Sequence, residues 1–174
     1  MQLFAMLENS AFGSWVRESS SIWAYPTILF MHTVGLGFLV GLNVVIDLRV
    51  LGFARRVPLA PLEKFYRVMW AAFWINAASG AALLVADATT KMTNPVFYIK
   101  LTFIALAVAT MVRLRRCAFG GSAAKESDRV GKPRGGRRLA IASLILWAGA
   151  ITAGRLMAYI GPVSGAPGLQ NRIR

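Results

Sequence analysis

Cysteine, histidine and acidic residues are scarce in this chain of 174 residues. The single cysteine, Cys117, excludes an internal disulfide and any metal motif built on several cysteines. The only histidine is His32. The chain also lacks the patterns of a Ser/His/Asp triad, a glycine-rich phosphate loop and paired catalytic carboxylates. The sequence therefore does not favour an enzyme.

Seven acidic residues stand against 20 lysines and arginines, which gives a net charge of +13. In a soluble protein such a charge would suggest a nucleic-acid partner. Here the basic residues cluster between long hydrophobic runs, a distribution that membrane topology explains better. We therefore expect contact with a lipid bilayer and no nucleic-acid partner.

Hydrophobic residues make up 56% of the chain, and its mean hydropathy is +0.54. They gather in four runs, each close to the ~20 residues that cross a ~30 Å hydrocarbon core. The sequence predicts an all-α fold, an integral membrane antiparallel four-helix bundle in residues 21–161. The predicted parts are spans at about 22–50, 68–88, 96–114 and 139–161, a basic loop at 113–138 and a C-terminal tail at 162–174.

Residues 1–20 are too short and too polar to span a membrane. Apolar side chains recur there at roughly helical spacing, which predicts a short interfacial helix with Trp15 at the depth of the lipid headgroups. The segment has neither a basic n-region nor an Ala-x-Ala site, so we expect no cleaved signal peptide.

The positions of the basic residues predict the orientation. The first and third connections between spans carry four and nine lysines and arginines, whereas the N-terminus, the second connection and the tail carry one, one and two. The positive-inside rule places the richer connections in the cytoplasm. The sequence therefore predicts a multi-pass protein of the bacterial inner membrane with both termini in the periplasm.

Gly37 and Gly41 form a GxxxG pattern in the first span, and small residues let membrane helices approach closely. Two interpretations follow, a seam between copies in a homo-oligomer or packing inside one chain. The sequence favours packing inside one chain.

His32 lies in the outer half of the first span, where an ionisable residue is a functional-site candidate by default. A neutral imidazole can ligate copper or haem iron, and an imidazole can also relay protons. Alternatively, His32 has a structural role and donates a hydrogen bond inside the bundle. A single histidine cannot supply both axial ligands of a haem, so further ligands would come from a methionine or a second copy.

A layer of charges is predicted near the outer ends of the other spans. Asp87, Lys100 and Arg155 reach similar depth when the helices run antiparallel. We expect Asp87 to pair with Lys100 or Arg155, either as a structural ion pair or in the wall of a pocket that faces the periplasm. The further residues predicted for this pocket are His32, Asn76, Tyr25 and Tyr159.

Two charges, Asp47 and Arg49, lie near the inner end of the first span. Their spacing of two residues keeps them from facing each other on a helix. We expect Asp47 to pair with a basic residue of the first connection, as a feature of topology and folding.

Several short motifs resemble a family of uncharacterised four-helix bacterial inner-membrane proteins, over residues 15–161. The residues that carry the resemblance are Trp23, Tyr25, Pro26, His32, Gly35, Gly41, Asp47, Leu48, Arg49, Leu51, Gly52, Ser79, Gly80, Ala86, Asp87, Ala88, Asn94, Pro95, Phe97, Lys100, Gly154, Arg155, Leu156, Ala158 and Tyr159. The glycine-rich first span with its histidine is also similar, more loosely, to copper-resistance-D-type membrane proteins.

Three hypotheses for function follow. The first is a redox accessory that binds copper or haem b through His32, in a pocket that is complete in one chain or shared with a second copy. The second is a structural or assembly subunit of a membrane complex. The third is a small transporter of an anionic or polar solute, with Lys100 and Arg155 as counter-charges.

Overall fold

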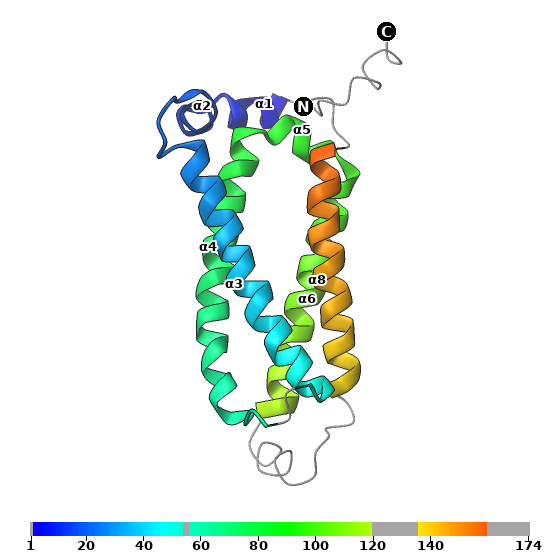
Figure 1. Ribbon diagram of the computed structural model, residues 1–174. Coiled ribbons are helices and arrows are strands. Elements are labelled where there is room, and N and C mark those ends of the chain that lie inside the picture. Colours follow the sequence, from blue (N-terminus) through cyan, green and yellow to red (C-terminus); the bar gives the residue numbers. More distant parts are fainter. Residues whose placement is uncertain (1, 54–55, 120–135, 160–174) are drawn as a thin grey trace.

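The computed structural model describes residues 2–53, 56–119 and 136–159, and all secondary structure in these ranges is helical (Figure 1). Four long helices run antiparallel: α3 (Tyr25–Leu51), α4 (Phe65–Ala86), α6 (Pro95–Phe119) and α8 (Gly136–Tyr159). Each of the four spans is long and apolar enough to cross a membrane. The predicted all-α helical bundle of membrane type is confirmed, and the chain is a multi-pass membrane protein by the length and composition of its helices.

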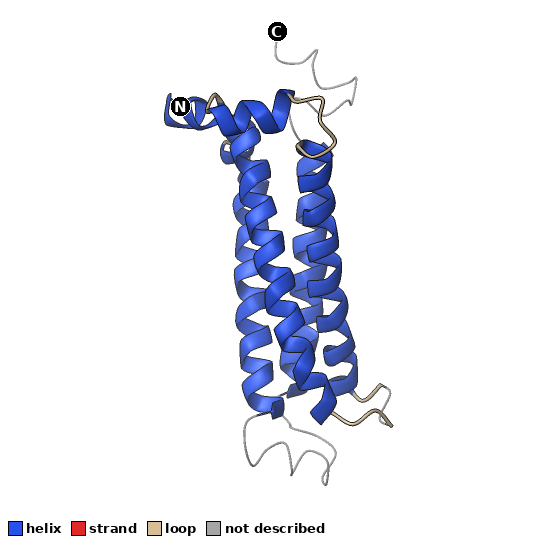
Figure 2. Cartoon of the chain, turned by 90° about the vertical axis from the view of Figure 1, so that its left-hand side faces the viewer, coloured by secondary structure: helices blue, strands red, loops and turns tan. Residues whose placement is uncertain are grey.

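The bundle consists of two helix pairs. α3 packs along α4 and α6 packs along α8, while contacts between α3 and α8 join the two pairs. Figure 2 shows the resulting rod of long helices. Its core extends from mid-height, where Leu39 and Trp147 lie, toward the end at which α4 begins, where Met69 and Met111 lie; all four side chains are almost completely buried. The two pairs pack less closely against each other than the helices within each pair do, so we expect space for a cavity between the pairs.

The connection between the first two long helices is shaped by a glycine and two prolines. Gly52 has a φ of 103° and ends α3, and the N–H of Phe53 closes the last turn on the carbonyl of Leu48. After Pro58, a 3₁₀ helix, η1 (Ala60–Lys64), leads directly into α4. The chain thus reverses direction between α3 and α4. We call the end of the bundle that carries η1 the loop end.

α6 is longer than predicted. It continues to Phe119, so Arg113–Phe119 is helical where a loop was expected at 113–138. Leu114 and Ala118 are buried against the bundle, which stabilises these extra turns, and the arginines between them lie exposed. α8 likewise begins at Gly136 rather than at 139. The rest of the predicted loop and the tail at 162–174 lie outside the described residues.

The opposite end of the bundle carries three short helices, which we call the collar (Figure 1). They are α1 (Gln2–Glu8), α2 (Ala11–Glu18) and α5 (Ala88–Met92). One N-terminal helix was predicted, but Ser10 divides the segment: its hydroxyl accepts a hydrogen bond from the N–H of Gly13 and caps α2. α5 lies in the second connection between the spans. α1 packs on α5, and α2 packs on α4.

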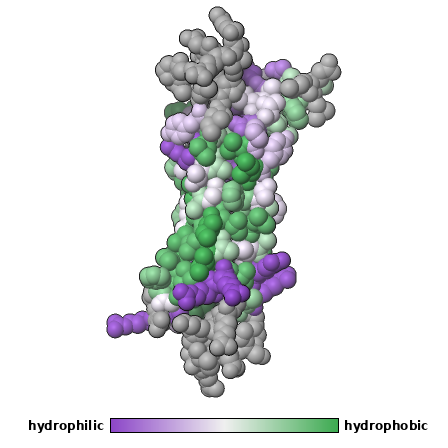
Figure 3. Space-filling view, turned by 90° about the vertical axis from the view of Figure 1, so that its right-hand side faces the viewer, coloured by the Kyte–Doolittle hydropathy of each residue, from purple (hydrophilic) through white to green (hydrophobic). Residues whose placement is uncertain are grey.

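The surface has the layering that a bilayer favours. Hydrophobic side chains cover the middle of the face shown in Figure 3, and hydrophilic side chains gather toward its two ends. Large apolar side chains are exposed on the long helices, among them Phe30, Phe38, Trp74 and Ile145. Such exposure is costly in water but not in lipid, so these helices are suited to contact with a lipid bilayer.

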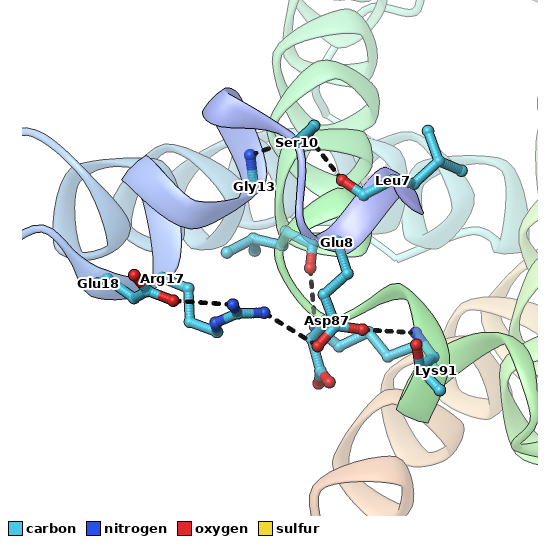
Figure 4. Close-up of polar contacts among 10 residues, drawn as sticks. Leu7, Glu8, Ser10, Gly13, Arg17, Glu18, Asp87 and Lys91 are labelled. Carbon is cyan, nitrogen blue, oxygen red and sulfur yellow. Dashed lines mark hydrogen bonds and ion pairs between the residues drawn. The ribbon is translucent and has the colours of Figure 1, made fainter. Parts of the chain in front are cut away.

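The collar is held together by the carboxylate of Glu8 (Figure 4). Its oxygens accept from a guanidinium nitrogen of Arg17 at 2.9 Å and from the backbone N–H of Thr89 at 3.1 Å. Hydrogen bonds from Thr89, together with the nearby charge of Arg17, lower the pKa of Glu8. One side chain thus ties α1 to both α2 and α5.

Acid should loosen this collar. Because the docked state lowers the pKa of Glu8, the undocked state binds more protons, and docking weakens as the pH falls below the ordinary carboxyl range of about 4.3 toward the lowered value. A spin label at Ala11→Cys, in a Cys117→Ser background, should gain mobility over that range. In the Glu8→Gln variant, the spin label should be mobile at every pH. The matched control is Glu18→Gln, which also loses a contact to Arg17 but none to α5; equal behaviour of the two variants would contradict the assignment.

Candidate functional site

A cavity of about 250 Å³ lies in the collar half of the bundle, between the two helix pairs. All four long helices contribute to its wall: Leu29, His32, Leu36, Asn76, Lys100, Ile104, Ala150, Ile151, Gly154 and Arg155. Four residues predicted for a pocket, His32, Asn76, Lys100 and Arg155, therefore meet in one place. Three others, Tyr25, Asp87 and Tyr159, do not line it.

His32 is held by a two-way contact between α3 and α4. Its Nδ1 lies 3.0 Å from the backbone carbonyl of Asn76, and the side-chain amide of Asn76 donates to the carbonyl of His32 at 2.6 Å. A carbonyl only accepts hydrogen bonds, so Nδ1 must carry a hydrogen. Ser79 lies 3.3 Å from the same nitrogen. Nε2 has no hydrogen-bond partner among the described residues and is available for a ligand.

Gly35 makes this contact between α3 and α4 possible. A Cβ atom at Gly35 would lie 3.1 Å from the carbonyl oxygen of Ala72 and 3.1 Å from the backbone nitrogen of Asn76. Glycine therefore lets the backbones of the two helices approach within one turn of His32. Packing inside one chain was the favoured of two interpretations for Gly37 and Gly41, and that interpretation was wrong. A Cβ at either would meet no atom within 4 Å, and both line an open groove on the outer face of α3.

Lys100 reaches across the cavity from α6 to α8. Its side chain lies over Gly154, with Nζ 3.8 Å from the position that a Cβ of Gly154 would take. The absence of a side chain at Gly154 thus leaves room for the lysine. Lys100 is only partly buried, and no carboxylate lies within ion-pair distance of it in the part of the chain that the structure describes.

Arg155 extends the positive wall toward the collar end. One of its guanidinium nitrogens donates to the hydroxyl of Tyr159 at 3.3 Å, and the guanidinium carbon lies 5.8 Å from the centre of the tyrosine ring. Asp87 does not neutralise Arg155 or Lys100. It forms an ion pair with Lys91 at 3.7 Å, one turn along α5, so the expected pairing of Asp87 was wrong. Among the described residues, no carboxylate forms an ion pair with either positive charge of the cavity.

A second polar cluster lies nearer the loop end and was only partly predicted. Asn43 on α3 donates from its side-chain amide to Asp47 at 2.6 Å and to Ser143 of α8 at 2.7 Å. All three side chains are at most 1% exposed. Within the described ranges, the second oxygen of Asp47 has no hydrogen-bond partner and no ion pair joins Asp47 to the first connection, contrary to expectation. Arg49 points elsewhere and donates to the carbonyl of Val57.

Asn43 is the hub of this cluster, so its replacement should destabilise the bundle. Asn43→Leu leaves buried oxygens of Asp47 and Ser143 without a donor, at about 1–3 kcal/mol each. We expect roughly 2–4 kcal/mol in thermal or SDS-induced unfolding of the protein in mild detergent. Asp47→Asn is the control, because an amide oxygen still accepts from Asn43. Equal losses in the two variants would show instead that the charge of Asp47 matters.

Comparison with known proteins finds no matching family model, no similar curated protein and no similar solved structure. The resemblances inferred from the sequence motifs therefore stay predictions.

Copper and haem b can be tested against the donor atoms of the cavity. Its wall offers one imidazole, from His32, but no thiol, thioether or carboxylate, and Lys100 and Arg155 would repel a metal cation. No three His, Cys, Asp or Glu side chains come together within the described ranges. At about 250 Å³ the cavity is also below the ~300–1,000 Å³ of sites for drug-sized ligands, and a porphyrin needs more room. The lining of this cavity does not fit either group.

Proposed function

We propose that the protein binds a small anionic solute in the cavity between its helix pairs and serves as a small membrane transporter for it. The observation that carries this proposal is that Lys100 and Arg155 both line one cavity and that no acidic residue lies in its wall. Charges within a membrane are costly unless they are paired, so two cations sharing a cavity favour an anion between them.

The remaining wall suggests what the anion looks like. His32 and Asn76 offer polar groups on one side, while Leu29, Leu36 and Ile104 form an apolar surface. A carboxylate or phosphate on a small apolar body would match both parts. Because Nδ1 already carries a hydrogen, only the protonated imidazolium, in which Nε2 carries one as well, can donate to the anion. In that form His32 would donate from Nε2 and fix the ligand's position.

Two other interpretations predict different results. A structural or assembly subunit would need the charged layer only for folding, so loss of Lys100 or Arg155 should lower the folded yield without changing any binding. A copper- or haem-binding accessory would need ligands from a second copy or a partner protein, since the cavity offers a single imidazole.

As for location, we propose the bacterial inner membrane with the collar and both termini in the periplasm, as the positive-inside rule favours.

The experiment compares an anion with its neutral counterpart. Thermal unfolding of the protein in mild detergent is followed with increasing benzoate or benzamide, which share a shape but differ in charge. A bound ligand stabilises the native state according to its concentration relative to Kd. We expect benzoate, and further small carboxylates and organic phosphates, to raise the melting temperature, and benzamide to leave it unchanged. Equal effects of each charged and neutral pair would overturn the proposal.

A further inference from the structure

A second cavity lies at the loop end of the bundle, on the side where α4 faces α6. Its volume is about 340 Å³. α4 packs mainly on α3 and α6 mainly on α8, so this side of the bundle is the more open one. The cavity has no part in the proposed function, because its lining shares no residue with the cavity of His32 and Lys100.

Two arginines of α6 form the charged part of this loop-end cavity. The guanidinium of Arg115 lies over the ring of Tyr66, 5.5 Å from its centre, and one nitrogen is 3.5 Å from the carboxylate of Glu63. Arg116, the next residue, also lines the cavity and makes no ion pair within the described residues. Two guanidiniums therefore face one carboxylate, and a net positive charge remains.

The apolar part of the same cavity lies one turn further into the bundle. Trp70 of α4 and Met111 and Val112 of α6 form this wall. On α6, Phe119 also lines the cavity beside Arg116 at the loop end, and inward of the two guanidiniums the wall is apolar. A phospholipid has the same order, a charged phosphate at the membrane surface and acyl chains below it.

We propose that this cavity is a binding site for the headgroup of an anionic phospholipid. Arg115 and Arg116 bind the phosphate, Tyr66 holds Arg115 in position, and Trp70 contacts the upper part of an acyl chain. An acidic peptide would satisfy the arginines but would leave the apolar wall uncovered at the depth of the hydrocarbon. The layering of the cavity therefore favours a lipid.

The test is thermal unfolding of the whole protein in mild detergent, titrated with phosphatidylglycerol or with phosphatidylcholine of the same acyl chains. We expect phosphatidylglycerol to stabilise at lower concentration. Arg115→Gln and Arg116→Gln should each raise its half-saturating concentration about fivefold, the effect of one basic residue near an anionic surface. Glu63→Gln should lower it, because this carboxylate competes for Arg115.

The matched control is Arg113→Gln. Arg113 has the same charge and lies on the same helix, but it is exposed and does not line the cavity. We expect less than a twofold effect from it. Equal effects of all three arginine variants would show general attraction to a charged surface and overturn the site. Equal stabilisation by both lipids, or the full effect from inorganic phosphate or an acidic peptide, would overturn the lipid as its occupant.

Discussion

Gly35→Leu should prevent the two helices of the first pair from packing together. The close approach at Gly35 involves backbone atoms of Ala72 and Asn76, which cannot rotate away as a side chain can. A leucine there forces α3 and α4 apart and separates His32 from Asn76, whose hydrogen bonds cross the same interface. Overpacking of a tight core typically costs 1–3 kcal/mol, and lost interhelical hydrogen bonds add to it.

We expect a total of roughly 3 kcal/mol or more, measured as SDS-induced unfolding of the protein in detergent, and a low folded yield. The control is Gly41→Leu, which makes the same substitution on the same helix where a Cβ meets no atom within 4 Å. It should unfold like the wild type within about 0.5 kcal/mol. Similar losses in both variants would show that Gly41 also packs, for example against a second copy.

Lys100→Gln should abolish most of the affinity for the anion while leaving the fold intact. A hydrogen bond between a charged group and its partner contributes about 1.5–3 kcal/mol, which corresponds to a loss of about tenfold or more in affinity. The stability without ligand should be unchanged or slightly higher, because Lys100 has no acidic partner in the described residues. Arg155→Gln should act in the same direction, and more weakly, since Arg155 is more exposed.

The control for charge is Lys91→Gln. This lysine lies at the same end of the bundle but binds Asp87 and the carbonyl of Leu83, outside the cavity. Its replacement should change anion affinity by less than about twofold, the level expected from a remote, screened charge. If Lys91→Gln and Lys100→Gln weakened binding equally, the anion would be responding to the overall potential at the collar end.

The spans could be predicted because an apolar run of membrane length has few alternatives. The sequence could not predict which face of each helix is buried. A membrane helix is apolar on all sides, so hydrophobic periodicity does not distinguish Gly35, which contacts α4, from Gly37 and Gly41, which face outward. The turns of α6 beyond residue 114 were missed because their arginines suggested a loop, whereas Leu114 and Ala118 hold them on the bundle.

The candidate site could be predicted in part. His32, Asn76, Lys100 and Arg155 stood out because each is polar within an apolar run, and antiparallel threading gives their depth. The partners of the charges could not be derived, because they depend on how the helices are rotated and where they end. Asp87 lies at the N-cap of α5 and pairs with Lys91 of that helix. Ser143 was missed because it joins Asn43 across 100 residues of sequence, and its only signal is a hydroxyl within an apolar run, which Thr152 in the same span also has.

The most direct test uses the fact that His32 is the only histidine. Histidine labelled with ¹⁵N gives one pair of ring signals, so the signals need no assignment to a residue. The account predicts that Nδ1 carries a hydrogen and that Nε2 shifts when benzoate is added, whereas benzamide leaves it in place and Lys100→Gln abolishes the shift. An Nε2 signal that does not shift with any anion, or that shifts equally with benzamide, would contradict an anion site in this cavity.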